Sequence, residues 1–127
     1  MSKIGTTPRM KLYNKIHKII REICLIRHPY CVTCKGQSGD TVLQAGHLIS
    51  RTCLNTRFDL MNVFTQCRSC NNKHEYRPEI FTQWFIKEYG IEEYNLLVNR
   101  SKQICKLSLK ELEEILQIMK NLLDKMK

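Results

Sequence analysis

The chain has 127 residues, with 21 lysines and arginines against 12 aspartates and glutamates, giving a formal charge of +9. This length predicts a single domain over residues 1–127, and the charge favours a polyanionic partner, most simply nucleic acid. The odd count of seven cysteines and the absence of a signal-like N-terminus argue against a secreted disulfide scaffold. No run approaches the ~20 apolar residues of a membrane span, so we expect a protein of the reducing cytoplasm.

Residues 8–28 are predicted to hold a helix from Pro8 to about Arg27, because Thr7 can cap it and Pro29 disfavours its continuation. Apolar residues recur at helical spacing along one face, at Leu12, Ile16, Ile19, Ile20, Ile23 and Ile26. The opposite face carries Lys11, Lys15, Lys18 and Arg21. That basic face fits two interpretations, contact with phosphates or simple exposure to water.

Residues 30–76 form the predicted core, which is polar and rich in cysteine. Turn-forming residues fill the segment 35–40. Short strands are expected at 42–45 and 63–66, with a loop at 49–56 between them. A helix is predicted to begin around 69–72. Strand, loop, strand and helix together make a ββα unit.

Two Cys-x-x-Cys pairs bracket this unit, at Cys31/Cys34 and Cys67/Cys70. This spacing presents two sulfurs from one tight turn, and two such turns predict a four-cysteine structural zinc site. A redox pair is disfavoured, because a thioredoxin-like motif expects a βαβ context. Of the other cysteines, Cys24 and Cys105 lie in apolar helical patterns and are expected to act as small hydrophobes, while Cys53 receives no role.

Residues 78–127 are predicted to form helices. Pro78 opens one that ends before Gly90, and a short one follows over 91–100. Ser108 and Glu111 fit a capping box for a final helix whose apolar face continues to the end of the chain. That face is suited to core packing or to a homodimer seam.

His47 lies between the cysteine pairs and is not needed by a four-cysteine zinc site. Imidazole titrates near neutral pH, so His47 is our candidate general base. A free imidazole beside a zinc knuckle in a strongly basic chain suggests a nuclease. Two alternatives remain: His47 replaces one of the cysteines on zinc, or it is an ordinary polar loop residue.

The run Asn62-Val-x-x-Gln-Cys-x-x-Cys-Asn71, following Gly46-His47, resembles the HNH, or ββα-metal, endonucleases that carry a zinc knuckle. More narrowly, residues 45–51, 56–59, 62–71 and 84–90 resemble the phage recombination protein NinG (Rap) family. The resemblance implies an α+β fold with a small zinc-stapled ββα-metal core flanked by N-terminal and C-terminal helices. It also implies a Mg²⁺- or Mn²⁺-dependent DNA endonuclease that cleaves branched intermediates such as Holliday junctions, in the cytoplasm of a bacterial host.

By this resemblance, Asn62 orients the histidine by tying the strand–loop backbone, and Asn71 offers its carbonyl oxygen to the catalytic Mg²⁺. His74, one turn after Asn71, is a second candidate ligand. The sequence departs from the family at Gly46, where many HNH enzymes carry a metal-binding aspartate. The missing ligand is then Asp40, Asp59, Glu75 or His47 itself.

Basic residues cluster around the same segment, and we expect at least one to touch DNA, among Arg51, Arg57, Arg68 and Lys73. Gly46 also favours a rival interpretation, a non-catalytic zinc module that binds nucleic acid. A second rival is a protein-interaction adaptor in which zinc only holds a helical scaffold together.

Overall fold

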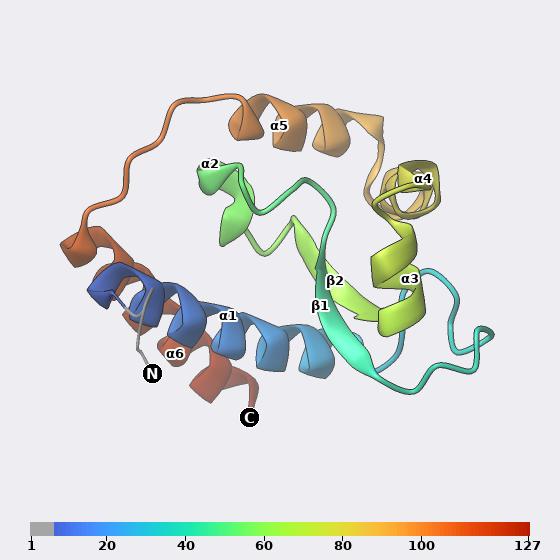
Figure 1. Cartoon of the computed structure of the whole chain (residues 1–127), viewed down its shortest axis with the longest axis horizontal. Coiled ribbons are helices and arrows are strands. Elements are labelled where there is room, and N and C mark those ends of the chain that lie inside the picture. The colour runs from blue at the N-terminus through green and yellow to red at the C-terminus, as the bar shows by residue number, and fades with distance from the viewer. Residues whose placement is uncertain (1–6) are drawn as a thin grey trace.

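The computed structural model describes residues 7–127 and is α+β, mostly helical, with one two-stranded antiparallel sheet. The helices and strands in chain order are α1 (Pro8–Arg27), β1 (Leu43–His47), α2 (Leu54–Arg57), β2 (Val63–Cys67), α3 (Arg68–Lys73), α4 (Pro78–Tyr89), α5 (Ile91–Ser101) and α6 (Leu109–Met126). The hairpin of β1 and β2 lies between the pair α1 and α6 and the pair α4 and α5 (Figure 1).

The long terminal helices begin and end where the local sequence signals place them. The Thr7 side chain accepts a hydrogen bond from the Met10 amide, and α1 ends at Arg27. Ser108 and Glu111 form the reciprocal capping box that starts α6. These two helices lie side by side (Figure 1) and bury their apolar faces against each other. The predicted bounds of the first helix and the predicted capping box are therefore confirmed.

The hairpin pairs Leu43 with Cys67 at one end and His47 with Val63 at the other. The first strand extends two residues beyond its predicted end, so His47 belongs to β1. The expected loop at 49–56 was wrong in its last residues, because α2 begins at Leu54. The amide and the hydroxyl of buried Thr56 both donate to the Cys53 carbonyl, which closes this helical turn.

Each face of the hairpin packs against its own hydrophobic cluster, as alternating strand residues should. Val63 joins the cluster formed with α1 and α6, together with the half-buried Ala45. Phe64 joins the second cluster, which includes Phe81 and Phe85 of α4 and Leu97 of α5. The hairpin is thus covered on both faces.

The two cysteines expected to act as small hydrophobes differ. Cys24 is buried in α1, and its thiol donates to the Val63 carbonyl at 3.4 Å. Cys105 is not helical, because α6 does not begin until the Ser108 cap, and it lies half-buried in the connection from α5. The helical expectation for Cys105 was wrong. Within residues 7–127, no helix is long and apolar enough to cross a membrane.

Candidate metal centre and the groove beside His47

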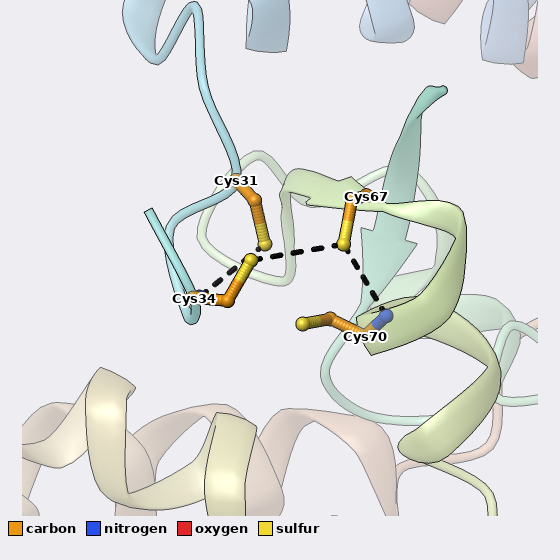
Figure 2. A group of neighbouring side chains, drawn as sticks. All are labelled: Cys31, Cys34, Cys67 and Cys70. Atoms are coloured by element: carbon orange, nitrogen blue, oxygen red, sulfur yellow. Dashed lines mark hydrogen bonds between the residues drawn. The ribbon is translucent and has the colours of Figure 1, made fainter. Parts of the chain in front are cut away.

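The two Cys-x-x-Cys pairs converge on one point (Figure 2). The Sγ atoms of Cys31, Cys34, Cys67 and Cys70 all lie within 4.8 Å of one another. Across the two pairs, Cys34 Sγ and Cys67 Sγ are 3.8 Å apart. This is the one group of three or more potential metal ligands found among residues 7–127. Four sulfurs at this spacing can hold a metal such as zinc.

The surroundings of the sulfurs suit thiolates bound to a cation. Each pair forms a knuckle in which the backbone amide of the second cysteine donates to the sulfur of the first, at 3.5 Å for Cys34 and 3.4 Å for Cys70. Hydroxyls from Thr33 and Ser38 lie 3.3 and 3.2 Å from the sulfurs of Cys31 and Cys67. Such donors stabilise the negative charge that a metal-bound thiolate carries.

His47 is not a member of the cysteine group; it lies at the other end of β1. Its Nε2–H donates to the Arg57 carbonyl at 2.9 Å, which leaves Nδ1 with a lone pair. Burial lowers the pKa of His47 to about 4; Arg51 and Arg57 act in the same direction, and the bond to the Arg57 carbonyl opposes them. His47 is therefore a neutral imidazole at physiological pH.

His17 of α1 supports this imidazole from the side. Its ring stands nearly perpendicular to that of His47, with the centroids 5.4 Å apart. His17 Nε2 accepts from Arg57 Nε at 2.9 Å, and burial together with His47 and Arg57 lowers the His17 pKa to about 3. From the sequence His17 received no role, because no spacing signal connects a residue of the first helix to the end of a distant strand.

Asn62 holds the loop that supplies the Arg57 carbonyl. It is fully buried, and its Oδ1 accepts from the Ile49 amide at 2.7 Å. Its Nδ2 donates to the carbonyls of Ile49 and Thr56, both at 3.0 Å. One side chain thereby ties the start of the segment that follows β1 to α2. The contacts match the backbone-tying geometry expected of Asn62, while its effect on any reaction stays a prediction.

Asn71 reaches from α3 to the middle of β1. Its Nδ2 donates to Gln44 Oε1 at 2.8 Å, which leaves Oδ1 as an acceptor. A Cβ atom placed on Gly46 would lie 3.1 Å from this Oδ1 and would overlap Oε1 of the buried Gln66. Glycine is therefore required at position 46 while Gln66 occupies its present place. Packing around position 46 thus favours glycine there, a constraint that the linear sequence did not indicate.

An open pocket of about 460 Å³ lies beside His47. It is lined by Ala45, His47, Ser50, Arg51, Asn71, Asn72, His74 and Glu75. Four residues singled out from the sequence as catalytic or metal-binding candidates therefore meet here: His47, Asn71, His74 and Glu75. His74 Nε2–H donates to the Leu48 carbonyl at 2.8 Å. Its buried Nδ1 finds no hydrogen-bond partner in the described part of the chain.

The acidic side chains considered as replacements for an aspartate at position 46 are separated by the fold. Asp40 accepts from the Ser69 amide at 3.0 Å and pairs with Arg68 at 3.3 Å. Asp59 pairs with Arg100 at 2.9 Å. Only Glu75 among the three lines the pocket with His47.

The four basic residues predicted to contact DNA do not form one surface. Arg51 lines the pocket. Arg57 is half-buried and its guanidinium stacks on Tyr13, 4.4 Å from the ring centroid. Arg68 is paired with Asp40, and Lys73 lines a separate small cavity near Cys34 and Cys70. Of these four side chains, Arg51 is the one that lines the pocket beside His47, whereas the Arg57 side chain, also near His47, is bonded to His17.

The comparisons with known proteins assign a family. The family model described as bacteriophage lambda NinG protein matches residues 3–127. Neither the curated proteins nor the solved structures gave a match. Since the family match covers nearly the whole chain, the protein belongs to the bacteriophage lambda NinG family and is a phage recombination-related protein.

Proposed function

We propose that this protein is a divalent-metal-dependent DNA endonuclease of the HNH type that cuts branched recombination intermediates such as Holliday junctions. The observation that supports it best is the state of His47. Its Nε2 is bonded to the Arg57 carbonyl, its Nδ1 keeps a lone pair, and it borders an open pocket away from the cysteine cluster.

The proton-transfer role follows from this state. Phosphodiester hydrolysis needs a base that removes a proton from the attacking water. A neutral His47 held by the Arg57 carbonyl accepts that proton at Nδ1, and the same carbonyl then stabilises the imidazolium through Nε2–H. Asn62 acts one step away as a positioning residue, because it fixes the segment that carries the carbonyl.

The second cation, Mg²⁺ or Mn²⁺, would be held by side chains of α3 and the turn after it. Two oxygen donors fit a hard cation: Asn71 Oδ1 is left as an acceptor, and the Glu75 carboxylate lines the pocket. His74 Nδ1, which is unmatched within residues 7–127, is a nitrogen donor and suits Mn²⁺ better than Mg²⁺. Mg²⁺ keeps most of its waters and needs few protein ligands. Such an ion supplies charge stabilisation at the scissile phosphate. Arg51, on the same wall as His47, would help to hold that phosphate.

The test is a nicking assay on supercoiled plasmid and on a synthetic four-way junction, with Mg²⁺ added to zinc-loaded protein. Loss of a general base lowers the rate by about 10²- to 10⁴-fold. We therefore expect His47→Ala to lose cleavage while keeping its DNA affinity and fold. His28→Ala is the matched control, since His28 is a half-buried histidine packed against Phe64 and Trp84 in the other cluster.

A non-catalytic zinc module that binds nucleic acid is the second candidate, and Gly46 is the observation that favours it. It predicts no cleavage by wild-type protein on any DNA form, with unchanged affinity in His47→Ala.

A junction enzyme makes two symmetric cuts and is expected to act as a homodimer. Sedimentation of the protein with and without junction DNA measures this directly.

A further inference from the structure

A second hollow of about 360 Å³ lies on the α1 side of His47. It is lined by Asn14, His17, Lys18, Arg21, Ala45, His47 and Arg51. Three of these residues, Ala45, His47 and Arg51, also line the pocket on the α3 side. The two hollows therefore adjoin at Ala45, His47 and Arg51, and together they are called the groove below.

The path of this groove follows from the hairpin. Both hollows are lined by β1 residues and by none of β2. In the described chain the sheet has only two strands, so β1 pairs on one edge and its other edge is available to the groove. A ligand strand could thus pass from α3, across the end of β1, onto α1.

The charge of the α1 half is positive. Its lining contains three cations, Lys18, Arg21 and Arg51, and no carboxylate. Lys18 and Arg21 are three residues apart on α1 and so share a face. Arg21 is held in place, because one guanidinium nitrogen donates to the Leu43 carbonyl at 3.1 Å. Anchoring of this kind reduces the entropy lost when the remaining N–H groups bind an anion.

We propose that this α1 half of the groove binds the sugar-phosphate backbone of DNA, through Lys18 and Arg21, on the side of His47 away from α3. The inference rests on the proposed function, because it continues the path of the strand whose phosphate would lie at His47. It assigns a use to one face of α1, a face that from the sequence alone could equally have been a solvated surface. The donors that α1 contributes to this lining, the cations Lys18 and Arg21 and the side-chain amide of Asn14, are of the kind that contact phosphate oxygens.

The electrostatic environment of His17 and His47 is consistent with binding of the DNA backbone in this groove. Burial is the main cause of their lowered pKa values, and Arg51 and Arg57 lower both further. Two guanidinium groups therefore act on the middle of the groove, and a bound anion would offset their charge. Exposed lysines elsewhere provide a comparison, since Lys120 and Lys125 lie on α6 and line neither hollow.

The experiment measures DNA affinity at several salt concentrations, by anisotropy of a labelled four-way junction, without Mg²⁺. The variants are Lys18→Ala, Lys18→Ala/Arg21→Ala and the control Lys120→Ala/Lys125→Ala, which removes the same charge. DNA affinity falls as the salt concentration rises, so the slope of log affinity against log salt is negative. Removing one cation that binds a phosphate reduces the magnitude of this slope by about one. We expect the magnitude of the slope to decrease by about one for Lys18→Ala and by about two for Lys18→Ala/Arg21→Ala. It should not change for Lys120→Ala/Lys125→Ala.

Equal slopes and affinities in the groove and control pairs would overturn the inference, as would wild-type protein that does not bind DNA. Lys18→Ala keeps the anchoring bond of Arg21 and so guards against a folding defect in the pair. Cleavage by the same proteins separates this inference from the proposed nuclease. If the slope is less steep for the groove pair but no Mg²⁺-dependent cleavage occurs, the DNA-binding groove is supported and the proposed nuclease activity is contradicted. If cleavage requires His47 but the slope is unchanged for the groove pair, the nuclease is supported and DNA binding by the α1 half of the groove is contradicted.

Discussion

The two ends of the hairpin are held in different ways. At the Leu43–Cys67 end, four cysteine sulfurs converge within 4.8 Å, an arrangement that can hold a metal cation. At the His47–Val63 end, the protein itself supplies every contact, through Asn62, the Arg57 carbonyl and His17. The first end can be held together by a metal such as zinc. The second keeps one imidazole nitrogen uncommitted, which is what a reactive site requires.

The comparison suggests a division of labour along the two short strands. A metal at one end would fix the end of β2 and the start of α3, the helix that carries Asn71. Hydrogen bonds at the other end fix the direction of His47. Disturbing the cysteine end should therefore unfold the region, while disturbing the hydrogen-bonded end should give graded effects.

Removal of the metal should have the largest effect. Structural zinc contributes about 10 kcal/mol of apparent folding free energy in isolated fingers, so chelation or Cys34→Ser should abolish cooperative unfolding of the hairpin region. Circular dichroism during thermal unfolding, together with the zinc content per chain, measures this. Cys53→Ser is the matched control, because Cys53 is also half-buried but lies outside the cluster. An unchanged melting curve after complete chelation would contradict a stabilising metal at the cysteines.

Asn62→Ala should be the most damaging single change at the other end. It removes three hydrogen bonds, at about 1 kcal/mol or more for each, and leaves the Ile49 amide and carbonyl without their partner, whereas the Thr56 carbonyl keeps the Asp59 amide. Urea unfolding should show a loss of about 3 kcal/mol or more. Asn121→Ala, on the exposed face of α6, should change the free energy of unfolding by less than about 0.5 kcal/mol. Similar losses of unfolding free energy in Asn62→Ala and Asn121→Ala would contradict a stabilising role for the Asn62 hydrogen bonds.

Acid should weaken the His47 end by a predictable amount. The pKa of His47 is about 4 in the folded protein against an ordinary value of 6.5, so the unfolded chain takes up the proton first. Stability is then full above pH ~6.5 and falls as the pH decreases towards 4, by about 3 kcal/mol at most. Urea unfolding between about pH 7 and pH 4.5 should give a flatter profile for His47→Gln than for wild type. Parallel profiles would show that His47 does not titrate as its burial requires.

Gly46→Ala should have the smallest effect of the four. Its Cβ would meet the buried Gln66 side chain, and overpacking of this kind costs about 1–3 kcal/mol. The cost should shrink in a Gln66→Ala background, because the obstructing oxygen is gone. A double-mutant cycle measured by urea unfolding reports this coupling. Purely additive effects would contradict the steric explanation for glycine at this position.

The parts of the fold that the sequence could predict are those with local signals. Thr7 before Pro8 and the Ser108–Glu111 pair specified helix starts, and the two Cys-x-x-Cys spacings specified the sulfur cluster. These signals act over a few residues, or through a ligand geometry that fixes the partners. The distance between the two cysteine pairs along the chain did not prevent this prediction, because a four-cysteine zinc site needs both pairs.

The parts that could not be predicted depend on which distant groups meet. The partner of His47 is the backbone carbonyl of Arg57, and a carbonyl carries no residue-specific signature. Asp40 and Asp59 were equivalent to Glu75 in the sequence, and only the fold pairs the first two with arginines. Likewise the obstruction of position 46 by Gln66 arises from strand register.

The most direct test of the two-ended hairpin is a crystal structure of His47→Ala with junction DNA and Mn²⁺, using the anomalous signal to locate each metal. We expect zinc among the four cysteines and a separate manganese ion beside Asn71 and Glu75, next to a DNA phosphate in the groove. Metal only at the cysteines, with the DNA backbone away from position 47, would contradict the assignment of this end as a cleavage site.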